Sequence, residues 1–176
     1  MIRKRSIMTM VVLLFSVMTT AIAQKKVIFQ ILIDPKMMIE GPYEESKNGK
    51  LDLVLKLGRS RESYEVGLFV NRFKALSYNS AGVYYNRKIN IEKFLPVLDK
   101  FELSGGLDTG FIHRIINSEK NYSFTASLNA ELKYFMKENF GVVLLSNYRY
   151  RGGLVEYYNT KNPMLFSGYF GVFYKF

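Results

Sequence analysis

The chain contains one histidine, His113, and this residue is the first candidate for catalysis. Asp108 and Ser118 lie five residues to either side of it, and a histidine, serine and aspartate together can perform acyl transfer. Such chemistry needs a base in hydrogen-bonding reach of the nucleophile and a third group that orients the base. This spacing establishes neither contact, and a histidine at the loop end of a strand is more simply a solvated residue. We therefore expect a protein that is not an enzyme.

Glu40, Glu44 and Glu45 come closest to a metal-binding group. Carboxylate oxygens suit hard cations, but three glutamates in one polar segment make a weak site at most. With one histidine and no cysteine, the chain has little else to offer a metal. We expect a solvated segment there, with no metal and no cofactor.

Charged residues of both signs alternate with apolar residues along the chain, which places them on one face. The acidic members of a candidate lumen charge network are Glu65, Glu102, Asp108 and Glu131, and the basic members are Lys133 and Arg149, with Lys56 and Lys88 on the same face. Charges enclosed inside a protein should pair, because an unpaired buried charge is costly. The mixture of signs therefore suggests an enclosed, internally paired face.

Two other uses of this face stay open. An anion-selective pore could be lined by Arg72, Lys133, Arg149 and Arg151. A route for small apolar molecules could be lined by Phe69, Tyr84, Tyr169 and Phe173. The alternative in both cases is that the side chains fill the interior, since eight strands leave just enough room for side chains.

The elements that position these residues follow from an alternation with a period of two. In residues 121–135, NYSFTASLNAELKYF, every second residue from Tyr122 to Tyr134 is apolar and the residues between them are polar. The same pattern recurs along the chain, and alternation of this kind indicates a β-strand with two different faces. It predicts eight strands, at 26–33, 51–58, 62–73, 80–89, 100–112, 121–135, 139–151 and 165–176. No convincing helical period is present.

The connections between these strands differ in length. Short turns are expected at 58–61 and 137–138, a connection of intermediate length at 74–79, and longer loops at 34–50, 113–120 and 152–164. In 34–50, proline and glycine break any strand. Segment 90–99 is longer than this scheme requires. The long loops otherwise fall on one side and the short turns on the other.

Alternation alone leaves open which face is outside. A soluble barrel puts the apolar face inside, whereas a membrane barrel puts it outside. Several predicted strands are long enough to cross a bilayer obliquely, and aromatic residues bound the apolar face at both ends, as in Tyr122 and Tyr134. These features favour an all-β, eight-stranded antiparallel up-and-down transmembrane β-barrel whose apolar face meets lipid.

The N-terminus has the three parts of a secretory signal. MIRKR is basic, Ile7 to Met18 is largely apolar, and Ala21 and Ala23 are small residues before Gln24. We expect a cleaved signal peptide at 1–23 and a barrel domain at 24–176. Without the signal, 22 basic residues stand against 15 acidic ones, a net charge of +7. This charge is scattered, so it suits anionic lipid better than nucleic acid.

The C-terminus supports a resemblance to a known group of proteins. The chain ends GYFGVFYKF, with Phe170, Val172, Tyr174 and Phe176 at alternate positions, and it contains the hairpin YFMKENFGVVLLSNYRY. These segments resemble small outer-membrane barrels of the OmpX, OmpW and OmpA-membrane-domain kind. The resemblance implies a place in the outer membrane, contact with its lipid, and recognition of the last strand by the barrel-assembly machinery. It implies no functional residue, and the absence of tryptophan departs from it.

Function stays open between classes. One is a structural or surface-interaction barrel that meets a partner through loops 34–50 and 152–164. The second is a small channel or transport barrel. The third is the outer-membrane component of a conjugal-transfer system, since the chain also loosely resembles proteins of the TraO kind.

Overall fold

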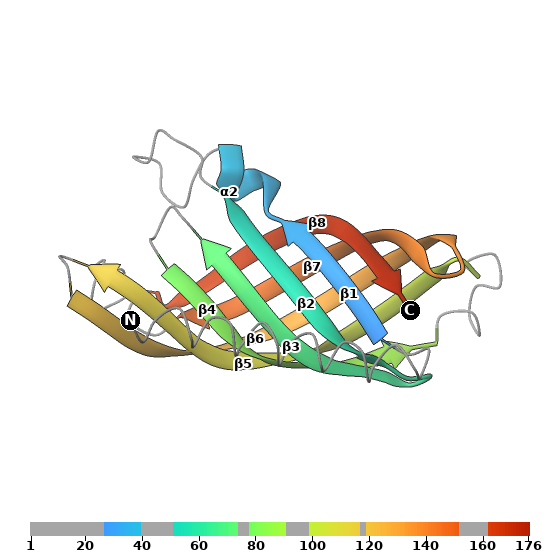
Figure 1. Ribbon diagram of the computed structural model, residues 1–176, viewed down its shortest axis with the longest axis horizontal. Helices are drawn as coiled ribbons and strands as arrows, with labels where there is room; N and C mark the ends of the chain where they lie inside the picture. Colours follow the sequence, from blue (N-terminus) through green and yellow to red (C-terminus); the bar gives the residue numbers. More distant parts are fainter. Residues whose placement is uncertain (1–26, 40–50, 74–77, 91–98, 117–118, 152–161) are drawn as a thin grey trace, which may run out of the picture.

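The computed structural model describes residues 27–39, 51–73, 78–90, 99–116, 119–151 and 162–176, and it is a closed barrel (Figure 1). Eight antiparallel strands follow one another in chain order, and the first pairs with the last. They are β1 (Val27–Ile33), β2 (Asp52–Ser60), β3 (Tyr64–Phe73), β4 (Tyr78–Ile89), β5 (Phe101–Ile116), β6 (Glu119–Lys137), β7 (Phe140–Arg151) and β8 (Met164–Lys175). The predicted eight-stranded up-and-down barrel is confirmed.

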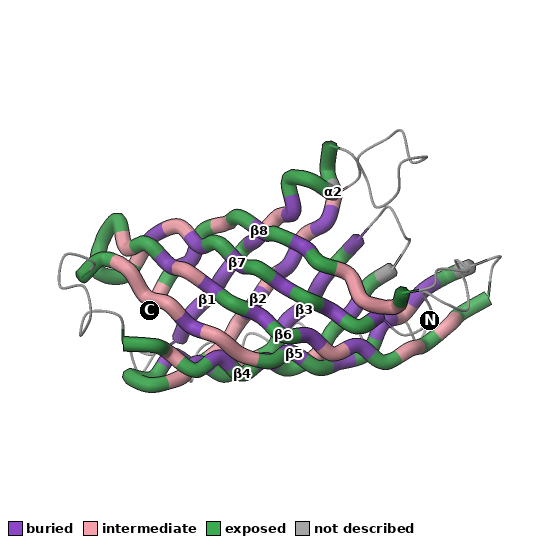
Figure 2. Tube along the Cα trace, turned by 180° about the vertical axis from the view of Figure 1, so that it is seen from behind, coloured by how far each residue is buried: buried purple, intermediate pink, exposed green. Residues whose placement is uncertain are grey.

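Alternation in the sequence becomes alternation between the inside and the outside of the barrel. Figure 2 shows buried and exposed positions following one another along most strands. In β3, for example, Glu65 and Phe69 are buried, whereas Val66, Leu68 and Val70 are exposed. Successive side chains of a strand point to opposite faces of the sheet, so the period of two in the sequence fixes which residues face inward.

The barrel has two unlike ends. The turns at 61–63 and 138–139 lie at one end, which we call the turn end, and the opposite end is the loop end. β1 begins and β8 finishes at the turn end, where the Phe176 amide donates a hydrogen bond of 2.9 Å to the Val27 carbonyl oxygen. Each of the two turns lies slightly further along the chain than predicted.

The predicted loop at 113–120 is wrong. β5 continues to Ile116 and β6 begins at Glu119, so residues on both sides of the predicted loop pair with each other, among them His113 with Tyr122. The segment FIHRII contains no glycine or proline, and its three isoleucines favour extended backbone. The β5–β6 ribbon therefore reaches beyond its neighbours at the loop end (Figure 1).

The expectation of no helix is also wrong at one place. A short helix, α2 (Pro35–Ile39), follows β1, and the Met38 amide donates to the Asp34 carbonyl oxygen at 3.1 Å. Aspartate followed by proline suits a helix start, because proline is favoured at the first helical position. Five residues are too few to show a helical period in the sequence.

No helix within the described ranges is long and apolar enough to cross a membrane. The predicted signal peptide, 1–23, lies outside the described residues, and so do 40–50 and 152–161, which make up most of two predicted long loops.

Candidate functional site

The barrel interior holds a cluster of charges centred on Glu131 of β6. This side chain is fully buried, and it accepts hydrogen bonds from Gln30 Nε2 at 2.9 Å and from Lys56 Nζ at 3.1 Å. Lys133 Nζ lies 2.6 Å from Oε1, the oxygen that also accepts from Gln30. Gln30 and Lys56 belong to β1 and β2, which lie across the barrel from β6. Glu131 therefore links opposite walls of the barrel. The side chains that contact it span the lumen at the height of Glu131.

Lys133 extends this cluster toward the turn end. Its Nζ atom lies 2.8 Å from Glu65 Oε2 and 3.3 Å from Glu102 Oε1. Glu102 also pairs with Lys88 at 2.8 Å and with Lys175 at 3.2 Å. We call this set the turn-end network; its members are Lys56, Lys88, Lys133, Lys175, Glu65, Glu102 and Glu131. Charges of opposite sign alternate through it, which compensates for their removal from water.

Asp108 of β5 is the centre of a second cluster. Asn129 Nδ2 donates to its Oδ1 atom at 2.7 Å, and Ser127 Oγ donates to Oδ2 at 3.1 Å. Asn147 and Arg149 of β7 approach the same Oδ2 atom at 3.3 Å and 3.5 Å. Neutral donors surround this carboxylate and Arg149 is its one ion-pair partner among the described residues, so the Asp108 cluster differs in kind from the turn-end network.

All six predicted network residues face inward, but the ion pairs divide them into two groups. Glu65, Glu102, Glu131 and Lys133 belong to the turn-end network, whereas Asp108 and Arg149 form the centre of the second cluster. The sequence analysis missed Gln30 and Lys175. Their positions in the alternation, between outward-facing apolar residues, were the signal that could have identified both.

The suggestion that Arg72 lines a pore is wrong. Its neighbours Asn71 and Phe73 are fully buried and face inward, so Arg72 faces outward and is exposed. Arg149 and Arg151 do face inward, where their guanidinium groups lie 5.4 Å and 5.2 Å from the ring centres of Phe69 and Phe73. Nearer the loop end, Asp52 accepts hydrogen bonds from Asn71 at 2.6 Å and from Tyr169 at 3.1 Å.

Apolar side chains fill the remaining interior on the side of β1, β2, β7 and β8. A buried cluster consists of Ile28, Leu32, Val54, Val143, Leu145, Tyr169 and Phe173. Inward glycines make room for large rings: a side chain at Gly58 would collide with the Tyr84 hydroxyl, and one at Gly141 would come within 2.9 Å of the Phe173 ring. The four aromatic residues that could have lined a route for apolar molecules are at most 2% exposed and fill the interior; they are Phe69, Tyr84, Tyr169 and Phe173.

The structure does not assemble the histidine, serine and aspartate set. Asp108 is buried inside the barrel, whereas His113 lies on the outer face with its ring 5.0 Å from that of Tyr122. Ser118 lies outside the described residues. β5 carries both Asp108 and His113 and puts them on opposite faces, because their positions differ by an odd number.

Metal binding finds no support in the described part of the chain. There, no three histidine, cysteine, aspartate or glutamate side chains lie close enough together to hold an ion. Glu40, Glu44 and Glu45 lie outside it.

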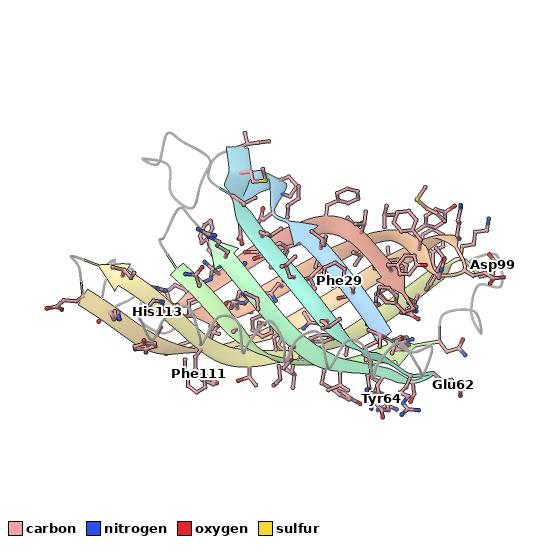
Figure 3. The ribbon with its side chains drawn as sticks, viewed as in Figure 1. Phe29, Glu62, Tyr64, Asp99, Phe111 and His113 are labelled. Carbon is pink, nitrogen blue, oxygen red and sulfur yellow. The ribbon has the colours of Figure 1, made fainter. Side chains whose placement is uncertain are left out.

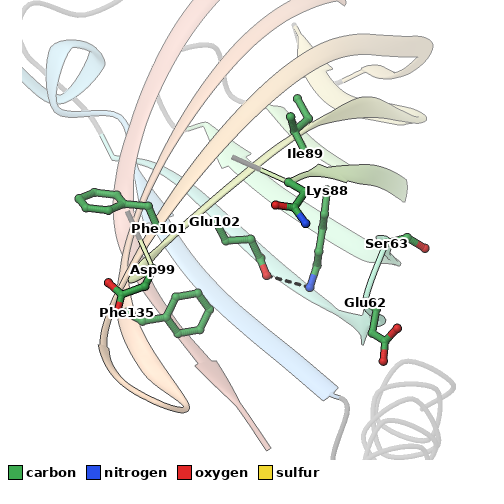
Figure 4. A pocket seen from close by; sticks show the side chains of 9 residues that line it. Glu62, Ser63, Lys88, Ile89, Asp99, Phe101, Glu102 and Phe135 are labelled. Atoms are coloured by element: carbon green, nitrogen blue, oxygen red, sulfur yellow. Dashed lines mark ion pairs between the residues drawn. The ribbon is translucent and has the colours of Figure 1, made fainter. Parts of the chain in front are cut away.

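A pocket of about 370 Å³ opens at the turn end (Figure 4). It lies beside the ion pair between Lys88 and Glu102, and Glu62 and Asp99 contribute two further carboxylates. Phe101 and Phe135 form its apolar part. Lys88 and Glu102 are the members of the turn-end network that line this pocket.

The outer surface is a belt of apolar side chains. Leu128 is 61% exposed and Phe111 is 69% exposed, and Figure 3 shows Phe111 pointing away from the barrel. Ring pairs bound the belt on β5 and β6: Phe101 with Tyr134 at the turn end, and Phe111 with Phe124 toward the loop end. At about 3.3 Å per residue and a tilt of about 45°, Phe101 and Phe111 are separated by about 23 Å across a bilayer, close to the ~25 Å apolar band of membrane barrels.

Exposing a continuous apolar belt of this kind to water is unfavourable. Soluble monomers rarely expose apolar patches larger than a few hundred Å². The predicted assembly signal contributes to the belt, because Phe170, Val172 and Tyr174 of β8 and Phe176 after it are outward and exposed. The barrel is therefore of the transmembrane type, with lipid outside and polar side chains inside.

Comparisons with known proteins agree with this geometry at the level of the fold. No protein-family model matches the sequence, and no curated protein does either. Among solved structures, the Yersinia pestis outer membrane protein Ail in a phospholipid bilayer nanodisc is similar over 87% of this chain and 100% of its own, with a TM-score of 0.54 and 15% identity. The fold is that of the small outer-membrane barrels. A de novo designed transmembrane β-barrel is similar over 86% of this chain and 96% of its own, with a TM-score of 0.53 and 10% identity.

Proposed function

We propose that the protein is an outer-membrane barrel with a structural or surface-interaction role, and that it performs no catalysis. One observation carries this proposal: Glu131 joins side chains from opposite walls of the lumen, so the interior is built as a packed core. The belt of exposed apolar side chains supports the location, because it fits the hydrocarbon of a bilayer.

The orientation follows from the two ends of the barrel. In small outer-membrane barrels the short turns face the periplasm and the longer loops face outward. By this rule the turn end is periplasmic, and loops 34–50 and 152–164 face outward together with the tip of the β5–β6 ribbon. These segments are where we expect a surface partner to bind.

Location is tested by fractionation. The mature protein should begin at Gln24, partition with the outer membrane and migrate differently on a gel when it has not been heated. Recovery of most of the protein in the soluble periplasmic fraction would contradict the proposal.

The packed lumen is tested by conductance in planar bilayers. The wild-type protein should show no steady conductance, because eight strands leave room only for side chains. The double variant E131A/K133A removes two side chains that span the lumen, and it serves as the control for the sensitivity of the measurement. Steady channels of the wild-type protein would favour the channel alternative.

Assembly through the last strand has its own test. Deleting Phe176 should lower the level of assembled barrel and leave export intact, whereas deleting the exposed residue Glu138 from the β6–β7 turn should matter less. An unchanged level of assembled barrel without Phe176 would show that the C-terminal pattern is not an assembly signal in this protein.

A further inference from the structure

Three arginines surround Tyr64 on the outer face of the barrel at the turn end. Arg87 of β4 pairs directly with Tyr64 of β3. On the other side, the Arg61 amide donates to the Tyr64 carbonyl oxygen at 2.8 Å, so Arg61 lies opposite Tyr64 as well. Arg59 lies two residues before Arg61 and pairs with Val66. We call Arg59, Arg61, Tyr64 and Arg87 the arginine surface; Figure 3 labels Tyr64 at its centre.

The arginine surface lies where the apolar belt ends on three neighbouring strands. The outward residues of β2 are leucines up to Leu57, and Arg59 follows. On β4, Val83 and Tyr85 are outward and exposed, Arg87 follows, and Ile89 is the one outward apolar residue of the strand beyond it. The Tyr85 ring stacks on that of Tyr64 at 5.9 Å. Because the belt meets hydrocarbon, the residues at its edge lie at the depth of lipid head groups.

Among the described residues, no carboxylate neutralises the charge of this surface. All three arginines are exposed, and none of them takes part in an ion pair within the described ranges. The lysines of the interior contrast with this, since Lys56, Lys88, Lys133 and Lys175 all pair with glutamates. Glu62 is the one acidic residue of the adjoining turn 61–63, and it forms no ion pair there either.

The geometry suits a phosphate. Residues directly opposite on neighbouring strands lie about 5 Å apart, so Arg61 and Arg87 are about 10 Å apart, on either side of Tyr64. Two arginine side chains can close on one group across such a gap, and guanidinium binds phosphate oxygens through two parallel N–H donors. A tyrosine between them suits the boundary of lipid and water, since it joins an apolar ring to a polar hydroxyl.

We propose that the arginine surface binds the head-group phosphate of anionic glycerophospholipids in the leaflet at the turn end of the barrel. This inference rests on the proposed membrane location. The lipid is the occupant because the surface continues the lipid-facing belt and carries the opposite charge to the head group.

The absence of tryptophan from the chain allows a local test. A single tryptophan at Val66, which pairs with Arg59, reports on the lipid beside the arginine surface, and one at Phe124 reports on the loop end. Each full-length mature variant is inserted into phosphatidylcholine vesicles that contain brominated phosphatidylglycerol or brominated phosphatidylcholine. Quenching by the two brominated lipids gives their relative binding at each position.

Phosphatidylglycerol should be preferred about fivefold at V66W, given ~1 kcal/mol for a basic residue near an anionic surface, with a preference near one at F124W. Adding R59Q/R61Q/R87Q should abolish the preference at V66W. Adding R59K/R61K/R87K keeps the charge but removes the paired donors, so it should leave a weaker preference than the arginines give. R72Q, which neutralises an outward arginine at the opposite end of β3, should leave the preference unchanged.

Equal quenching by the two lipids at V66W, or a preference that survives R59Q/R61Q/R87Q, would overturn the proposal. Loss of the preference on adding inorganic phosphate at constant ionic strength would assign the surface to free phosphate and overturn it too. The membrane proposal is tested separately in the same samples, because it predicts that all variants insert into pure phosphatidylcholine and show the heat-modified gel shift. Failure of the wild type to insert would contradict the membrane location, whereas insertion without lipid preference contradicts only the arginine surface.

Discussion

The inner and outer faces of β6 are in contact with different surroundings. On the inner face Glu131 is fully buried and Lys133 is 1% exposed, and each makes several charged contacts. On the outer face Leu128 is 61% exposed. A soluble barrel would show the reverse arrangement. The difference shows that specific ion pairs and hydrogen bonds determine which residues suit the inner face. On the outer face, apolar surface area and depth in the bilayer determine this.

This difference predicts two kinds of sensitivity. A substitution on the inner face should lower stability because it leaves a buried charged or polar partner unpaired. The effect of a substitution on the outer face on stability should depend on the depth of the residue in the bilayer and little on its neighbours. Each of the following variants tests one side of this contrast.

The largest effect should come from E131A. It leaves Lys56 and Lys133 without their shared carboxylate, and removing one partner of a buried ion pair typically costs about 3–5 kcal/mol. The measurement is the free energy of unfolding in urea, followed by the loss of the gel shift in vesicles. E131Q keeps the shape of the side chain and one acceptor oxygen, so it should cost less than E131A, although its amide nitrogen faces donors that the carboxylate accepted from. Equal stability of E131A and wild type would show that the turn-end network does not hold the inner face together.

L128R should follow. In the transmembrane barrel this position faces hydrocarbon midway between Tyr122 and Tyr134, where a lipid-facing arginine costs about 2–4 kcal/mol. Y122R, near an interface, should cost only about 0–1 kcal/mol on the same strand. The same unfolding measurement compares the two variants. A penalty that does not depend on depth would contradict the assignment of the outer face.

D108N should have the smallest effect of the three. With the amide oxygen in the place of Oδ2, Ser127 and Asn147 can still donate to it, so the change removes the acceptor of Asn129, the charge of the other bonds and the ion pair with Arg149. We expect a cost of about 1–2 kcal/mol, typical of hydrogen bonds to a charged group. A cost as large as that of E131A would remove the distinction between the two interior clusters.

Much of the barrel could be predicted from the sequence, because every second side chain of a strand lies on the same face and the apolar residues repeat with that period. Leu128 and Asn129, for example, were assigned to opposite faces, and the structure places them so. The strand ends were less predictable. FIHRII and the residues after Glu119 belong to strands, and no glycine or proline marks where the ribbon ends.

The interior contacts could not be predicted. Glu131 and Gln30 are separated by 101 positions in the sequence, and their contact depends on how far the strands tilt and shift around the barrel. Alternation gives the face of each residue but not its height or its partner across the lumen. Arg72 shows a simpler failure, since the positions of Asn71 and Phe73 already indicated that it faces outward.

The central claim is that the apolar face meets lipid, and a spin label at Leu128 tests it most directly. The chain has no cysteine, so L128C carries a single nitroxide label in the folded protein in vesicles. Collisions with oxygen, which dissolves in hydrocarbon, should be frequent, and collisions with a water-soluble nickel chelate should be rare. A label at the exposed turn residue Glu138 should show the opposite ratio. Frequent collisions of the nickel chelate with the label at Leu128, equal to those at Glu138, would contradict the account.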